Sequence, residues 1–472
     1  MSKIQAFAAV RQSRKMQTPV RATSLPASRR RFNLGFLIVA AAILHVSVAL
    51  TIFAIGRYQL FPSQIYPTGI GRFAEDGISY EGQVVELSNI VRSEGVRAWA
   101  TWLTQLHVRL YSIPLTVLSR WFSCNILTIE PVNLIYYLAI LTLVFKLAES
   151  LFGYKTGLVA ATIVGLWPSF LLHTTQLLRD PLFISALLVV VWSVVMCLKQ
   201  KLSWRWGMWL GIGTGVAILT IRIVRQPVWA LLCIIIGAGM LLIVVQAIRE
   251  QRVAAGTIVF AILIMATVVI TPRFQSSFRN QQQTRMNGFT IPTEPQKLTL
   301  DDQIKYRRWG FQFKLDEEGK SLPADDGSRI DSDIQFAGLG EIIRHVPRAI
   351  AIGFFAPFPN MWLRVGKQVG YSGRVVAGIE MLMTYMIEFF ALFGLWSARK
   401  SLSAWFLGIV IGLGATALGL VVNNVGAMYR LRYPFWVLLV IFGAGGISFL
   451  FRRFQNRESH RVDKPSGREV SI

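Results

Sequence analysis

The sequence predicts an all-α polytopic membrane protein with about ten transmembrane helices and additional helices at one membrane surface. Of its 472 residues, 53% are hydrophobic and only 16% are charged, which is less charge than soluble domains carry. The apolar residues form continuous blocks of roughly 20 residues, the length that a helix needs to cross a bilayer. Only helices or closed barrels span lipid, because every backbone polar group must be paired internally. Continuous rather than alternating blocks favour helices.

Ten apolar blocks are expected to cross the membrane. They are Leu34–Ile55, Val132–Phe152, Gly157–Leu172, Pro181–Leu198, Gly207–Ile221, Val228–Ile248, Ala254–Thr271, Val375–Trp396, Leu402–Val422 and Pro434–Phe451. A basic segment, residues 1–32, precedes the first block, and a second, residues 453–472, follows the last. An even number of spans and the positive-inside tendency together predict that both termini are cytoplasmic.

The net charge of +24 comes from 49 Lys and Arg against 25 Asp and Glu. Because most of the basic residues flank the apolar blocks, they are interpreted as orienting a membrane protein, and no nucleic acid is expected as a partner. The three cysteines, Cys124, Cys197 and Cys233, have no CxxC spacing, so no disulfide framework is expected.

The hydrophilic segments divide the chain further. A transmembrane module, residues 33–271, includes a first external loop at 56–130, and a hydrophilic external loop follows at 272–345 before the C-terminal transmembrane region at 346–452. Within the first loop, helical spacing begins after Ser79.

Three of the less apolar segments are given their own interpretations. Leu103–Phe122 contains three charged or His residues and fits an interfacial helix better than a span. The second loop is expected to be partly helical around Asp301–Phe313. The segment that begins at Pro347 contains two further prolines, which favour a surface or re-entrant position over a straight span.

The adjacent carboxylates Glu75 and Asp76 follow the first span. Near an apolar surface they can act as a general base or hold a cation. The alternative is a solvated loop in which Asp76 caps the helix that begins near Ser79.

A second charged pair, Arg179 and Asp180, stands at the start of a membrane block. Because Pro181 suits the first turn of a helix, Asp180 is a candidate N-cap. Charged residues at a membrane border are nevertheless costly and often functional.

Arginines on the expected external side run against the usual charge bias. Arg222 and Arg225 follow one span, and Arg430 and Arg432 precede another with Tyr429 beside them. A guanidinium binds phosphate through two parallel donors, so a lipid phosphate is one expected partner. Ordinary headgroup contact and aromatic anchoring are the alternatives.

Two glutamates, Glu380 and Glu388, lie inside one predicted span and roughly on one side of its helix. They are expected to pair with membrane arginines, to line a cavity, or simply to pack. The sequence contains no HExxH, Walker loop, GxSxG or Cys/His metal spacing, which argues against zinc protease, ATP-driven and serine hydrolase functions.

The order of these features resembles the GT-C integral-membrane glycosyltransferases. The resemblance covers Asn33 to Trp192 and rests on EDGISYEGQVVELS after the first span, then LFGYKTG, then WPSFLLHTTQLLRDPLF. The layout is similar to that of the aminoarabinose and protein O-mannosyl transferases. The later APFPN and NNVGAMYRLRYP segments resemble bacterial relatives of surface-polysaccharide synthesis. A WWD-type oligosaccharyltransferase motif is missing.

The resemblance implies an inverting transferase in the bacterial inner membrane that uses a polyprenyl-phosphate sugar on the extracytoplasmic face. The acceptor is a glycan, lipid or protein. Asp76 then matches the catalytic base, Glu75 assists or substitutes for it, and Asp180 orients the acceptor or the base. Arg179 and Tyr80 are substrate-binding candidates. Some members use a divalent metal, and these residues leave that question open.

Two other classes of function stay open. One is a non-catalytic membrane component, or a polymerase or ligase, of polysaccharide assembly. The other is a transporter, which would place charged or broken helices at mid-membrane and often carry a repeat.

Overall fold

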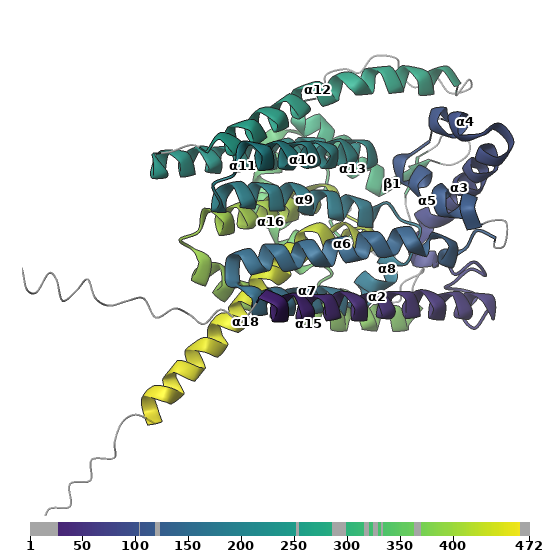
Figure 1. Ribbon diagram of the computed structural model, residues 1–472. Helices are drawn as coiled ribbons and strands as arrows, with labels where there is room; N and C mark the ends of the chain where they lie inside the picture. The colour runs from purple at the N-terminus through teal and green to yellow at the C-terminus, as the bar shows by residue number, and fades with distance from the viewer. Residues whose placement is uncertain are drawn as a thin grey trace, which may run out of the picture.

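The computed structural model describes residues 27–102, 104–118, 123–251, 254–285, 299–315, 321–323, 329–331, 334–362 and 370–462. Within these residues, nine helices are long and apolar enough to cross a membrane, and they lie side by side in one bundle (Figure 1). They are α2 (Ala27–Arg57), α6 (Ile126–Phe152), α9 (Asp180–Lys199), α10 (Trp204–Val224), α11 (Trp229–Glu250), α12 (Ala255–Arg285), α15 (Gly370–Ala398), α16 (Leu402–Val421) and α18 (Tyr433–Val462). The prediction of an all-α polytopic membrane protein is confirmed.

The one predicted span that is not among these nine helices, Gly157–Leu172, is bent. Helices α7 (Tyr154–Gly165) and α8 (Pro168–Thr174) meet at an angle of 68°. Pro168 lies in the first turn of α8. Because proline has no N–H to donate, it cannot continue α7, but it is well tolerated in the first turn of a new helix. The Tyr137 hydroxyl of α6 donates to the Gly165 carbonyl at 2.7 Å, so a backbone group freed by the bend is paired.

A buried polar contact fixes α8 to its neighbours. His45 of α2 lies 2.6 Å from Glu130 of α6 through Nδ1 and 3.1 Å from the Thr174 hydroxyl through Nε2. All three residues are buried. The contact therefore joins three helices at the end of the bent span, immediately before the loop that leads to α9.

One end of the bundle carries several short helices (Figure 1). They are η1 (Arg72–Ala74), α3 (Glu75–Glu94), α4 (Val96–Thr101) and α5 (Leu106–Leu118). With 13 residues, α5 is about 20 Å long, too short to cross a bilayer, which agrees with the interfacial interpretation. The start of α2 and the end of α18 lie toward the opposite end.

The apolar part of α12 ends at Pro272, where the long hydrophilic segment was expected to begin, and the helix itself continues into that segment as far as Arg285. The expected helix is present as α13 (Leu300–Gln312). It leads into a small antiparallel hairpin of β1 (Phe313–Leu315) and β2 (Ser321–Pro323), which the sequence did not predict.

The proline-containing segment forms α14 (Leu339–Phe355) and η4 (Pro359–Met361). At 17 residues, α14 is not one of the nine candidate spans. Its last carbonyls are paired by side chains of other helices: Tyr385 donates to Phe355 at 2.7 Å, and Arg432 donates to Phe354 at 2.9 Å. Such pairing lets a helix end lie against a membrane bundle.

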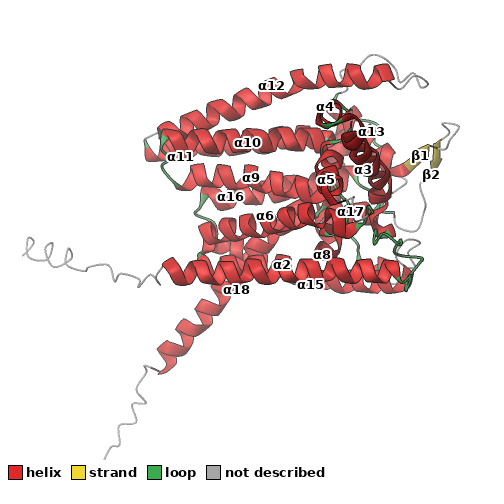
Figure 2. Cartoon of the chain, turned by 45° about the vertical axis from the view of Figure 1, so that its right-hand side comes forward, coloured by secondary structure: helices red, strands yellow, loops and turns green. Residues whose placement is uncertain are grey.

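Close approach of backbones holds the C-terminal helices together. A Cβ added at Gly446 of α18 would lie 1.9 Å from the Phe390 carbonyl oxygen of α15, so only glycine fits there. Small residues at such contacts are typical of membrane helix pairs. Two remaining short elements, η2 (Gln226–Val228) and α17 (Val425–Leu431), each connect two spans, and α17 contacts α3 through Arg430 and Asp76 (Figure 2).

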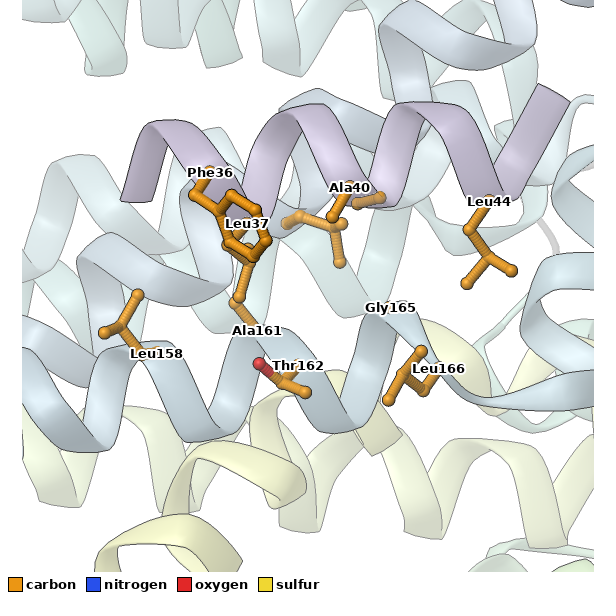
Figure 3. Close-up of a pocket in the computed structure, with 11 residues that line it drawn as sticks. Phe36, Leu37, Ala40, Leu44, Leu158, Ala161, Thr162, Gly165 and Leu166 are labelled. Atoms are coloured by element: carbon orange, nitrogen blue, oxygen red, sulfur yellow. The ribbon is translucent and has the colours of Figure 1, made fainter. Parts of the chain in front are cut away.

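A groove of about 360 Å³ runs between α2 and α7 (Figure 3). Apart from Thr162, its lining is apolar: Phe36, Leu37, Ala40, Ala41, Leu44, Leu141, Leu158, Ala161, Gly165 and Leu166. Without a titratable side chain the groove offers no acid–base chemistry, and it contains none of the candidate residues. Its lining suits a hydrocarbon chain.

Candidate functional site

Two aspartates from separate loops meet at the end of the bundle that carries α3 and α5. Asp76 lies in the first turn of α3, and Asp180 is the first residue of α9. Arg430 of α17 bridges them: its Nη2 lies 2.6 Å from Asp76 Oδ2, and its Nε lies 3.0 Å from Asp180 Oδ2. Arg225, between α10 and η2, donates to the other Asp180 oxygen. We name these four residues the Asp–Arg cluster.

Burial differs between the two aspartates. The Asp76 side chain is 40% exposed, whereas that of Asp180 is 7% exposed. Asp76 is therefore the carboxylate that a solvent-borne group can reach, and Asp180 is the one that holds the two arginines in place.

A third arginine, Arg179, adds positive charge to this region. Burial lowers the pKa of Arg225, and repulsion from Arg179 and Arg430 lowers it further. The Nε of Arg179 is buried without a hydrogen-bond partner among the described residues. Three arginines face two aspartates, so the group carries one positive charge in excess.

Contact between α3 and the loop before α9 brings the aspartates together. A Cβ added at Gly77 would lie 3.2 Å from the Leu177 carbonyl oxygen, so the missing side chain allows this close approach. The Gly71 amide donates to the Gln176 side chain at 2.8 Å. Residues next to each aspartate are thus tied across the loops.

Side chains of α5 and α6 also hold the loop before α9 in place. Tyr111 of α5 donates to the Leu178 carbonyl at 2.9 Å and to Asn133 of α6 at 2.7 Å. Asn133 in turn donates to the Gln176 carbonyl at 3.2 Å. These buried bonds orient the backbone that carries Arg179 and Asp180.

Neither aspartate is the helix cap that was considered as an alternative. Helix α3 begins at Glu75 and not near Ser79, and its N-cap residue is Ala74. Helix α9 has Arg179 at its N-cap, with no side-chain cap bond. Both carboxylates face arginines instead. The Glu75 side chain lies outside the described part of the chain.

Three of the other predicted residues lie away from the Asp–Arg cluster. Arg432 donates to the Phe354 and Ala356 carbonyls, and the guanidinium of Arg222 stacks on Trp229 with 5.1 Å to the ring centroid. Tyr429 donates to Glu380.

The two membrane glutamates differ. Glu380 also accepts from the Ser169 amide at 2.8 Å, so among the described residues its carboxylate contacts Ser169 and Tyr429 and not a membrane arginine. One oxygen of Glu388 is buried without a hydrogen-bond partner among the described residues.

Tyr80, one turn after Asp76, packs edge-on against His107, with ring centroids 4.4 Å apart. Sequence reasoning treated His107 only as a charge that weakens a span. Burial, together with repulsion from Arg179 and Arg225, lowers the pKa of His107 to about 3. Its place next to the cluster depends on the packing of α3 against α5, which no local pattern indicates.

The fit of a divalent metal can be judged from the charges. No group of three His, Cys, Asp or Glu able to hold an ion occurs in the described part of the chain. Both aspartates already face arginines, and the excess positive charge repels a cation. These residues therefore do not fit a divalent metal.

Comparison of this chain with protein-family models, with curated proteins and with solved structures finds no match.

Proposed function

We propose that the chain is a membrane glycosyltransferase that moves a sugar from a polyprenyl-phosphate donor to an acceptor hydroxyl. The reaction would take place at the surface formed by α3 and α5, in the synthesis of a surface polysaccharide or glycolipid. The Asp–Arg cluster carries the proposal, because it sets a partly exposed carboxylate beside two arginines, to which the neighbouring Arg179 adds a third positive charge. The layout of the sequence supports the same class.

The charge of the cluster suits the donor. A sugar–phosphate–lipid diester carries one negative charge, which equals the excess positive charge of the cluster and Arg179 taken together. Guanidinium groups bind phosphate through paired donors, and burial strengthens each contact by lowering the local dielectric. Arg225 and Arg430 are the arginines whose position the aspartates fix.

The proposed step balances as follows. Asp76 accepts the proton of the acceptor hydroxyl, whose oxygen then forms a bond to the anomeric carbon. The bond from that carbon to the phosphate oxygen breaks, and its electron pair leaves with the lipid phosphate. The configuration at the anomeric carbon inverts. Because the phosphate gains a negative charge, the arginines stabilise the transition state more than the bound donor.

The Asp76–Arg430 contact implies an order of binding. While Arg430 holds Asp76 at 2.6 Å, the carboxylate is partly occupied as an acceptor. A donor phosphate that attracts Arg430 would free Asp76 to act as the base. Donor binding would therefore precede acceptor activation.

The proposal also places this surface on the extracytoplasmic side of a bacterial inner membrane, with both termini cytoplasmic. Its support is the basic character of the connectors at the other end and of the two terminal segments in the sequence. A reporter enzyme active only outside the cytoplasm, fused after residue 472, should be inactive. An active fusion would show that the proposed orientation is wrong.

Substitution of Asp76→Asn tests the reaction. In a deletion strain that carries the variant, the lipid-linked or surface glycan lost on deletion should stay absent, as mass spectrometry of extracts would measure. Glu86→Gln is the matched control, since it removes an exposed carboxylate from the same helix and should restore the product. Full product with well-expressed Asp76→Asn would refute catalysis by Asp76.

The same experiment addresses the non-catalytic alternative. An assembly component that only binds a lipid phosphate would need Arg225 and Arg430 but not the Asp76 carboxylate. Product loss in Arg430→Gln together with normal product in Asp76→Asn would favour that alternative.

A further inference from the structure

We propose that His107, with Tyr80 and Arg179, forms a binding site for a hydroxyl group of the sugar beside the Asp–Arg cluster. This inference rests on the proposed function and assigns to His107 a role in recognising the carbohydrate part of the donor. It separates two tasks within one region: arginines for the phosphate and an imidazole for a hydroxyl.

The first observation is an unpaired buried histidine. His107, the second residue of α5, is fully buried, and neither ring nitrogen has a hydrogen-bond partner among the described residues. Leaving buried polar atoms unpaired destabilises a fold. By contrast, His45 contacts Glu130 and Thr174, and His173 contacts the Ser169 carbonyl at 2.6 Å. A purely structural histidine would be expected to have such partners.

The second observation is its position. The His107 ring lies edge-on to Tyr80, and Tyr80 lies one helical turn after Asp76 in α3. The charges of Arg179, Arg225 and Asp76 all act on it electrostatically, which places it beside the Asp–Arg cluster. The unpaired Nε of Arg179 is a further free donor in the same region.

The protonation state selects the ligand. With a pKa of about 3, the ring is neutral at cellular pH and offers one N–H donor and one acceptor nitrogen. A hydroxyl group also donates and accepts, so it can satisfy either nitrogen. Phosphate diester oxygens only accept, and they suit arginine better. A sugar hydroxyl therefore matches the histidine, and the phosphate matches the arginines.

Access requires a movement of Tyr80. Tyr80 is 6% exposed and lies against the His107 ring, so its side chain must turn for a hydroxyl to reach the nitrogens. A sugar would then lie against the tyrosine ring, a common arrangement for an amphipathic ligand.

The test compares two probes on the purified full-length protein in nanodiscs: a polyprenyl methyl phosphate, a sugar-free diester with the same single negative charge that we call the bare phosphate, and polyprenyl-phosphate monosaccharides of several kinds. At least one sugar-bearing lipid should bind more tightly than the bare phosphate. His107→Leu should weaken that binding by on the order of 10-fold, the loss of about one good hydrogen bond, and should leave bare phosphate binding unchanged. His107→Gln, which keeps a donor and an acceptor, should recover part of the affinity.

The outcomes separate this inference from the proposed function. If the bare phosphate fails to bind the wild-type protein, the proposed function is wrong. If the phosphate binds but no sugar-bearing lipid binds more tightly, or if His107→Leu weakens both probes equally, the hydroxyl site is wrong. Thermal stability supplies a second measurement: His107→Leu should be at least as stable as wild type, because it removes unpaired polar atoms.

Discussion

The two aspartates should respond very differently to loss of charge, and this difference can be measured without knowing the substrate. In Asp180→Asn, the buried guanidinium of Arg225 loses its carboxylate while both partners' side chains are about nine-tenths covered. Breaking a buried pair in this way costs about 3–5 kcal/mol. In Asp76→Asn, the lost carboxylate is 40% exposed, and exposed pairs contribute about 0–1 kcal/mol.

The assay is the free energy of unfolding in mixed micelles, measured by titration with a denaturing detergent and followed by tryptophan fluorescence. Glu86→Gln sets the baseline for an exposed carboxylate on α3. We expect the free energy of unfolding of Asp76→Asn to lie within about 1 kcal/mol of that of Glu86→Gln, and that of Asp180→Asn to be well below both. Equal losses for the two aspartates would refute the assignment of Asp180 as the buried anchor.

This hierarchy decides how activity data should be interpreted. Loss of product in Asp180→Asn is uninformative about chemistry if the protein is destabilised by several kcal/mol. Loss of product in Asp76→Asn at near wild-type stability is direct support for a catalytic carboxylate. The kinetic comparison therefore belongs with Asp76, and the stability comparison belongs with Asp180.

Three further predictions follow from the same contacts. Because the folded-state pKa of His107 is lowered to about 3 from 6.5, the unfolded chain binds the proton first as the pH falls. Between pH 7.5 and pH 5 the wild type should lose about 2 kcal/mol more unfolding free energy than His107→Gln, and parallel pH curves for the two proteins would refute this. Gly77→Ala should lower product formation, since the new Cβ would lie 3.2 Å from a carbonyl oxygen of the loop before α9. Gly82→Ala on the same helix has nothing within 4 Å, so equal activities of these two variants would contradict the argument. Glu130→Ala should cost about 1–3 kcal/mol by leaving a buried histidine without its partner, whereas Glu149→Ala, which removes a more exposed pair from the same helix, should cost less than about 1 kcal/mol.

The membrane spans were predictable because length and apolarity alone determine them. The bend between Gly165 and Pro168 was not, since Gly157–Leu172 is apolar throughout most of its length. The visible signal was Pro168 itself, and the groups that hold the bent helices in place, Tyr137 and His45, come from elsewhere in the fold. A hydropathy pattern reports the average environment of a segment and not its straightness.

The candidate site was only half predictable. The sequence placed Asp76, Asp180, Arg225 and Arg430 on one face, but 354 positions separate Asp76 from Arg430, and no local pattern pairs them. Arg432 shows the physical reason: it donates to the Phe354 and Ala356 carbonyls, whereas Arg430 contacts both aspartates. Side chains that are two residues apart near the end of a helix point in nearly opposite directions. Arg430 and Arg432 therefore cannot both face the same site.

Arg179 adds a third arginine beside the Asp–Arg cluster, and this excess of positive charge supports the proposal that the region binds an anion. Buried ion pairs contribute little net stability, because desolvation offsets their attraction. Here the arginines also repel one another, and that repulsion lowers the pKa of Arg225 beyond the effect of burial. An anion placed among them would relieve the repulsion, and each arginine would then gain a second acceptor. The net positive charge of these five side chains is therefore consistent with the proposed binding of a phosphate diester, whose single negative charge would balance it.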